Sequence, residues 1–145
     1  FRTMVQNADK IGSLVTVGND ARITRIGKII RKVRLDELPQ LINILKGEMT
    51  FVGTRPEVKK YVDKYTDEMM ATLLMPAGVT SIASIKYKDE DEILDEAVKA
   101  GKDTDLAYLE DVLPEKMKYN LKYIKQFSVL YDFKICIDTV IGVLR

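Results

Sequence analysis

The chain has 145 residues and a formal net charge of +1, with 23 lysines and arginines against 22 aspartates and glutamates. This length suits a single compact domain with a real hydrophobic core, and the balanced charge gives no general attraction for nucleic acid or for an acidic partner. The sequence has no histidine and one cysteine, Cys136, which excludes an internal disulfide and removes the commonest general base and metal ligand.

The first predicted elements are a short strand at 13–17 and a basic helix. Apolar residues recur at helical spacing from Ile23 to Val33. The helix is also rich in cationic residues, which is typical of a solvated helix face, and equally of a surface that binds phosphates, nucleic acid or lipid head groups. Between Ala21 and Leu35 the chain carries no acidic residue and six cationic ones, namely Arg22, Arg25, Lys28, Arg31, Lys32 and Arg34.

Asp36 and Glu37 form an acidic pair directly before the next predicted helix. Pro39 suits the first helical position, and Gly47 suits the end of the helix. Both carboxylates are thereby expected at or just before a helix N-terminus, where backbone N–H groups and the helix dipole favour anions, including phosphate. The same pattern is typical of helix capping, because Glu37 and Gln40 resemble a capping box.

A strand-like run at 49–52 leads into a turn that contains Arg55, Pro56 and Glu57. Proline holds the residue before it in extended backbone, so we expect Arg55 to present its guanidinium in a fixed direction. An arginine held in this way is a good bidentate ligand for phosphate. A surface turn with a salt-bridged arginine gives the same pattern.

The remaining elements are predicted to be mainly helical. The fold class expected is α+β, a mainly helical single domain with a few short strands near Ser13, Met49 and Ile82. Cys136 lies among apolar residues, which favours core packing over reactivity. No run of about 20 apolar residues is present. We expect helices at 58–74 and from about 90 to 100, a strand at 82–87, a short element at 106–112, and one long final helix opened by Pro114.

Six segments, taken in this order and spacing, resemble the catalytic domain of the bacterial sugar transferases. These enzymes are also called monotopic phosphoglycosyl transferases or polyprenyl-phosphate hexose-1-phosphate transferases. The resemblance implies one catalytic domain over residues 1–145. The matching segments are 1–4, 20–27, 31–53 with Asp36-Glu-Leu-Pro-Gln40, Arg55-Pro-Glu57, 76–80, and Leu113-Pro-Glu-Lys116 with the final helix.

Enzymes of this family move a sugar-1-phosphate from a nucleotide diphosphate sugar, typically a UDP-sugar, to polyprenyl phosphate. This reaction starts surface glycan assembly at the cytoplasmic face of the bacterial inner membrane. The resemblance implies that Asp36 is the nucleophile, forming an aspartyl-phosphosugar intermediate, with Glu37 as its partner. It further implies that Arg31, Arg55 and Glu57 bind substrate phosphate, and that Mg²⁺ lies at Asp36. Members usually carry Pro where this chain has Thr54, which predicts a less rigid turn at Arg55.

The family's re-entrant membrane helix precedes the point that corresponds to Phe1, so we expect a fragment of a longer protein, soluble or peripheral to the membrane.

Two other functions fit parts of the pattern. One is a non-catalytic membrane or scaffold module that lays cationic, amphipathic helices on anionic lipid. The other is a nucleic-acid-binding module that uses the basic helix at 23–33. The near-neutral charge and the lack of an aromatic-rich basic sheet argue against it, and we expect no nucleic acid partner.

Overall fold

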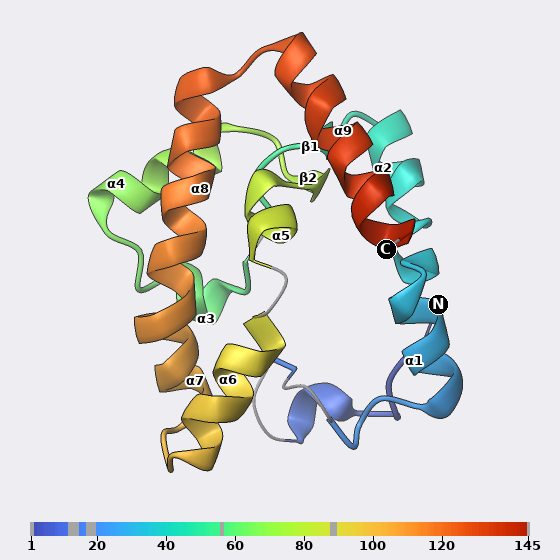
Figure 1. Cartoon of the computed structure of the whole chain (residues 1–145), viewed down its shortest axis with the longest axis vertical. Helices are drawn as coiled ribbons and strands as arrows, with labels where there is room; N and C mark the ends of the chain where they lie inside the picture. Colours follow the sequence, from blue (N-terminus) through green and yellow to red (C-terminus); the bar gives the residue numbers. More distant parts are fainter. Residues whose placement is uncertain (1, 12–14, 17–19, 56, 88–89, 145) are drawn as a thin grey trace. The chain divides into compact units, whose positions relative to one another are not determined.

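The computed structural model describes residues 2–11, 15–16, 20–55, 57–87 and 90–144 (Figure 1). The chain divides into two compact units, each built from two separate segments. Unit 1 comprises Phe1–Pro39 and Asp89–Leu113, and unit 2 comprises Gln40–Lys88 and Pro114–Arg145. The described residues are mainly helical with two short parallel strands. The expected α+β class is therefore confirmed, while one domain over residues 1–145 stays a prediction.

Unit 1 contains the basic helix, and its local sequence explains where that helix begins. The Thr24 hydroxyl accepts the Gly27 N–H at 2.9 Å, which caps the helix. A side chain at Gly27 would place its Cβ 2.0 Å from the carbonyl oxygen of Thr3, so only glycine allows this close approach. The elements of unit 1 are η1 (Ala8–Lys10), α1 (Arg25–Lys32), η2 (Leu35–Glu37), α6 (Glu90–Lys99), α7 (Thr104–Ala107) and η4 (Tyr108–Val112).

The predicted helices of unit 1 are confirmed, but the apolar side of α1 is largely exposed. Ile26 and Ile29 are 70% and 67% exposed, so helical spacing here does not indicate a buried face. The helix predicted from about 90 to 100 is α6, whose first turn contains Glu90, Asp91 and Glu92. Gly101 follows it with φ +88°, a backbone angle that favours glycine. The helices α6, α7 and η4 contact one another and bury Leu94, Ala107, Tyr108 and Val112. Thr3 and Ala8 of the same unit are also buried.

Unit 2 is built around the two strands and the last two helices. β1 (Thr50–Val52) pairs in parallel with β2 (Gly78–Thr80), with Thr50 opposite Gly78. Val52, Tyr123 and Ile135 form the buried cluster on which the unit packs. The helices of unit 2 are α2 (Gln40–Leu45), α3 (Lys59–Val62), α4 (Asp67–Met70), η3 (Ala71–Leu74), α5 (Ile82–Lys86), α8 (Leu113–Gln126) and α9 (Val129–Leu144).

Cys136 packs against this cluster, as the apolar pattern predicts. Burial, and then the charge of Asp132, raise the pKa of its thiol. A raised pKa lowers the thiolate fraction at neutral pH, and the thiolate is the reactive form. Cys136 therefore serves as a small apolar side chain.

The strand predicted at 82–87 is wrong, because this segment forms helix α5. The Ser81 hydroxyl accepts the Ser84 N–H at 2.9 Å and so begins a helix. The strand lies earlier, at Gly78–Thr80, where glycine permits close approach to β1. Of the first predicted strand, at 13–17, the structure describes only Val15 and Thr16, and neither residue is in a strand.

Two predicted long helices are interrupted. The segment 58–74 divides into α3, α4 and η3, because the Thr66 hydroxyl accepts the Met69 N–H at 3.3 Å and starts a new helix. The final helix divides at Phe127 and Ser128, where the Ser128 hydroxyl accepts the Tyr131 N–H at 3.2 Å. Figure 1 shows the bend between α8 and α9. None of the helices in the described part of the chain is long and apolar enough to cross a membrane.

Candidate active site

Asp36 lies in the short turn η2, between α1 and α2. The turn begins at Arg34, which has a left-handed φ of +54°, and the Glu37 N–H donates to the Arg34 carbonyl at 3.2 Å. Helix α2 starts at Gln40, so the acidic pair precedes this helix, as the sequence predicts. The half-buried Asp36 carboxylate makes no hydrogen bond or ion pair with any residue that the structure describes. Its side chain is therefore not a helix cap among these residues.

Glu37 has a different environment from its neighbour. Its carboxylate oxygen Oε1 lies 3.6 Å from Arg34 Nη1, and the Glu37 side chain is 15% exposed. The pair is an i, i+3 contact, a spacing at which opposite charges stabilise a helical turn. Glu37 is thus partnered within the turn, whereas Asp36 keeps both of its carboxylate oxygens available.

Arg31 lies in unit 1, like Asp36 and Glu37, and a hydrogen bond orients its guanidinium. Its Nε donates to Thr3 Oγ1 at 3.1 Å, and the Thr3 carbonyl in turn accepts the Thr24 N–H at 3.0 Å. The two terminal nitrogens of Arg31 make no hydrogen bond within the described residues. The two terminal nitrogens, which can bind phosphate in a bidentate manner, are therefore available, while Thr3 fixes the guanidinium through its Nε.

The turn that carries Arg55 follows β1 in unit 2. The Thr54 hydroxyl donates to the Thr72 carbonyl at 3.0 Å, and the Gly78 N–H donates to the Thr54 carbonyl at 3.1 Å. Hydrogen bonds therefore anchor Thr54, the position where the resemblance leads us to expect proline. Arg55 is exposed. The extended backbone of Arg55 was predicted from Pro56, which lies outside the described residues.

Glu57 forms an ion pair that the sequence did not predict. Its Oε1 lies 3.2 Å from Lys116 Nζ on α8, and both side chains are largely buried. Lys116 belongs to a segment that matches the family, but its role was not predicted. In the structure Lys116 is adjacent to Met117 and one turn from Asn120, both of which are buried, but no pattern in the sequence relates it to Glu57.

The five predicted site residues fall into two groups. Arg31, Asp36 and Glu37 belong to unit 1, and α1 contacts η2. Arg55 and Glu57 belong to unit 2. The structure therefore brings the first three residues into one unit, and the meeting of the two groups stays a prediction.

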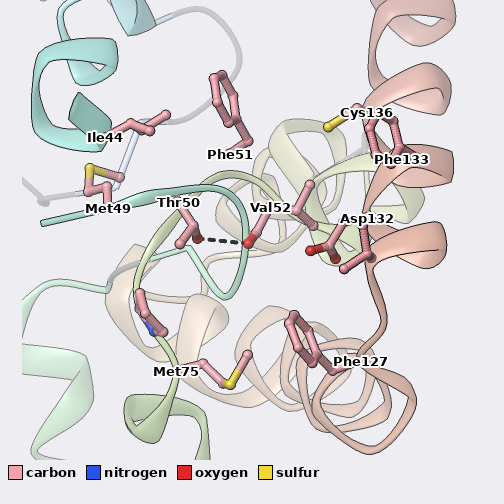
Figure 2. Close-up of a pocket in the computed structure, with 12 residues that line it drawn as sticks. Ile44, Met49, Thr50, Phe51, Val52, Met75, Phe127, Asp132, Phe133 and Cys136 are labelled. Carbon is pink, nitrogen blue, oxygen red and sulfur yellow. Dashed lines mark hydrogen bonds between the residues drawn. The ribbon is translucent and has the colours of Figure 1, made fainter. Parts of the chain in front are cut away.

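Unit 2 also contains an apolar pocket of about 590 Å³ (Figure 2). Most of its lining is hydrophobic, and its one charged side chain among the described residues is Asp132, whose Oδ1 accepts the Tyr123 hydroxyl at 2.8 Å. Phe127 and Phe133 are more than half exposed at its edge. Pockets of this size and apolar character are typical of ligand sites. The lining residues come from α2, β1, the segment at 75–76, the bend before α9, and α9 itself.

The sequence profile of the family described as bacterial sugar transferase matches residues 1–145. The chain belongs to this family. The fold therefore represents a sugar transferase domain, and Arg31, Asp36, Glu37, Arg55 and Glu57 are the residues that the resemblance assigned to its chemistry.

Curated relatives carry more specific names. The chain is 32% identical, over 99% of its length, to a UDP-N-acetylgalactosamine-undecaprenyl-phosphate N-acetylgalactosaminephosphotransferase of Aeromonas hydrophila, of which it covers 31%. It is 31% identical, over 95% of its length, to a UDP-glucose:undecaprenyl-phosphate glucose-1-phosphate transferase of Klebsiella pneumoniae, of which it covers 27%. Over 48% of its length it is 46% identical to a Bacillus subtilis protein, of which it covers 38%, named as a putative undecaprenyl-phosphate N-acetylgalactosaminyl 1-phosphate transferase. The chain thus spans about a third of the length of these relatives.

Proposed function

We propose that the chain transfers a sugar-1-phosphate from a nucleotide diphosphate sugar, most simply a UDP-sugar, to polyprenyl phosphate. The reaction would start surface glycan assembly at the cytoplasmic face of the bacterial inner membrane. The observation that carries the proposal is the Asp36 carboxylate, which is held in a turn beside Glu37 without a partner among the described residues. The names of the relatives support the donor and acceptor classes.

The proposed chemistry has two steps at one phosphorus atom. An Asp36 carboxylate oxygen attacks the phosphorus that bears the sugar, and the bond from this phosphorus to the nucleoside monophosphate breaks. An oxygen of polyprenyl phosphate then attacks the same phosphorus, the bond to Asp36 breaks, and polyprenyl-diphosphate sugar is released. The covalent intermediate divides one difficult transfer between two anions into two easier steps.

Positive charge is required at each step, because both the nucleophile and its target are anionic. Phosphoryl transfer depends mostly on positioning and on electrostatic stabilisation. Arg31 supplies an open guanidinium in the unit that carries Asp36. Arg55, on the turn that the Thr54 hydrogen bonds anchor, supplies another positive charge.

Mg²⁺ is the proposed metal. Mg²⁺ is commonly held by one or two carboxylates together with substrate phosphates, and the Asp36 carboxylate is a donor of this kind. Asp36, with its available carboxylate, is the residue that would hold it. When bound, the ion would neutralise charge on the diphosphate.

The apolar pocket of unit 2 suits part of the hydrocarbon chain of the acceptor. Its walls are aliphatic and aromatic, and burial of apolar chain from water is favourable in proportion to the area covered. Figure 2 shows the side chains of Phe127, Asp132 and Phe133 on one side of the pocket.

The proposed function is tested by intact-protein mass spectrometry after incubation with a panel of UDP-sugars and Mg²⁺. A mass increase equal to one sugar phosphate, absent from the Asp36→Asn variant, would support the covalent route and identify the donor. A folded chain that gains no mass with any donor, and transfers no sugar phosphate to polyprenyl phosphate, would contradict the proposal. In that case charge reversal at Arg25 and Lys28 would test the alternative of a lipid-binding scaffold.

Replacing Arg55 with lysine is expected to lower kcat/KM for the donor about 10- to 100-fold, because lysine keeps the charge but loses the bidentate fork. Steady-state kinetics with a UDP-sugar measure this effect. Lys60→Arg is a control on the exposed surface after the same turn, and it should leave the kinetics unaltered. Equal kinetics for the Arg55→Lys variant and the unaltered chain would exclude Arg55 as a bidentate ligand.

Replacing Phe133 with serine is expected to raise the KM for polyprenyl phosphate about tenfold, because the pocket loses aromatic surface that the acceptor chain would cover. Formation of the sugar-phosphate adduct should be unaffected. Leu130→Ser is the matched control, since Leu130 is an exposed apolar residue of the same helix that does not line the pocket. If both variants change the acceptor KM equally, the effect belongs to the exposed helix surface and not to the pocket.

A further inference from the structure

A largely buried ion pair joins α8 to the turn that carries Arg55. Lys116 Nζ lies 3.2 Å from Glu57 Oε1, and the two side chains are 11% and 9% exposed. Both residues belong to unit 2, and Glu57 is two residues from Arg55. The contact therefore connects the end of the predicted phosphate-binding turn to a long helix.

Stability alone is a weak explanation for this pair. The desolvation of two buried charges offsets much of their attraction, and an apolar pair of similar size is often equally stabilising. Asn120, one turn further along α8, is 3% exposed, and its Oδ1 has no hydrogen-bond partner among the described atoms. The buried side of α8 thus keeps polar groups at positions where apolar residues would stabilise the fold more simply.

The ion pair also changes the charge that the turn presents. Arg55 and Glu57 carry opposite charges, so together they would leave the turn neutral toward an anionic substrate. The Lys116 ammonium adds a second positive charge, which makes the net charge of the three side chains positive. Tyr65 is also affected by Glu57. Burial, and then repulsion from the Glu57 carboxylate, raise the pKa of the Tyr65 phenol.

We infer that Lys116 is a positioning residue for donor binding: its ion pair with Glu57 holds the backbone that presents Arg55. This inference rests on the proposed function, in which the turn meets the diphosphate of a nucleotide sugar. Glu57 then acts as the anchor of the turn and not as a direct ligand of phosphate, since two anions repel. Lys116 acts through Glu57 and not on the reacting atoms.

The test replaces Lys116 with methionine, which keeps the aliphatic stem and removes the charge. We expect the KM for the UDP-sugar donor to rise about tenfold or more, with a smaller change in kcat, because the arginine is displaced from its binding geometry. Lys116→Arg should restore most of the donor affinity. Lys118→Met is the matched control on the same helix, because Lys118 pairs with Glu115 in an exposed contact, and it should leave both constants unaltered.

A second variant distinguishes an effect on folding from an effect on donor binding. If Lys116→Met does not fold, the double variant Lys116→Met/Glu57→Gln, which removes both charges of the ion pair, is measured in its place. It should fold and still show a raised donor KM, because the turn has lost its anchor. A donor KM equal to that of the unaltered chain in either folded variant, with only stability reduced, would overturn the inference.

The outcome for the unaltered chain distinguishes this inference from the proposed function. If the unaltered chain turns over no nucleotide sugar, the proposed function fails and this inference fails with it. If the unaltered chain is active and the Lys116 variants keep its donor KM, the positioning role alone fails.

Discussion

The Asp36→Asn variant is expected to lose sugar-phosphate transfer by a factor on the order of 1,000 or more, since removal of a covalent nucleophile has effects of at least this size in other enzymes. An amide does not form the acyl phosphate bond that the proposed route requires. The carboxylate has no hydrogen bond or ion pair to lose among the described residues, so the variant should fold as the unaltered chain does. Initial rates with UDP-sugar and polyprenyl phosphate, together with thermal unfolding, measure both quantities.

Two further substitutions make this result specific. Glu37→Gln removes the neighbouring charge but leaves Asp36 in place, and a smaller loss of activity is expected. Asp67→Asn changes an exposed aspartate in α4 and should have no effect on activity. Near-normal transfer by Asp36→Asn would exclude an aspartyl intermediate at this position.

The Gly78→Ala variant is expected to lower the free energy of unfolding by about 3 kcal/mol, because the added methyl group overpacks a site that has no room for it. An added Cβ would lie 2.1 Å from the Gly53 nitrogen and 2.6 Å from the Gly53 Cα. These are backbone atoms of the paired strand region, so no side-chain movement relieves the clash. Chemical denaturation followed by circular dichroism measures the change in the free energy of unfolding.

Gly101→Ala is the matched control for this prediction. Gly101 has φ +88°, yet an added Cβ would meet nothing within 4 Å. Only backbone strain is introduced there, at a cost of about 1 kcal/mol. If both variants lost the same stability, the close approach of β1 and β2 would not be the reason for glycine at position 78.

Local signals in the sequence predicted several elements correctly. The basic helix at 23–33 and the helix from about 90 to 100 each depend on spacing or capping signals that lie within a few residues. The order of the acidic pair and α2 was also predictable, because Pro39 marks the start of that helix. Such features need no knowledge of distant residues.

Other features depend on residues far apart in the chain. The strand at 82–87 was wrong because pairing with β1, through Gly78, places the strand earlier than hydrophobicity alone suggests. The helix interruption at Ser128 comes from a hydroxyl cap within an otherwise apolar run. The ion pair of Glu57 with Lys116 joins residues that periodicity cannot relate, so the role of Lys116 was not predicted.

The construction of each unit from two separate segments has a consequence for synthesis of the chain. Unit 2 begins at Gln40, but Tyr123 and Ile135 of its core are in its second segment. Until that segment leaves the ribosome, Val52 of β1 lacks the two residues against which it is buried. Apolar surface exposed in this way promotes aggregation, so a ribosome that stops after Gln126 would release a chain whose strands lack α9.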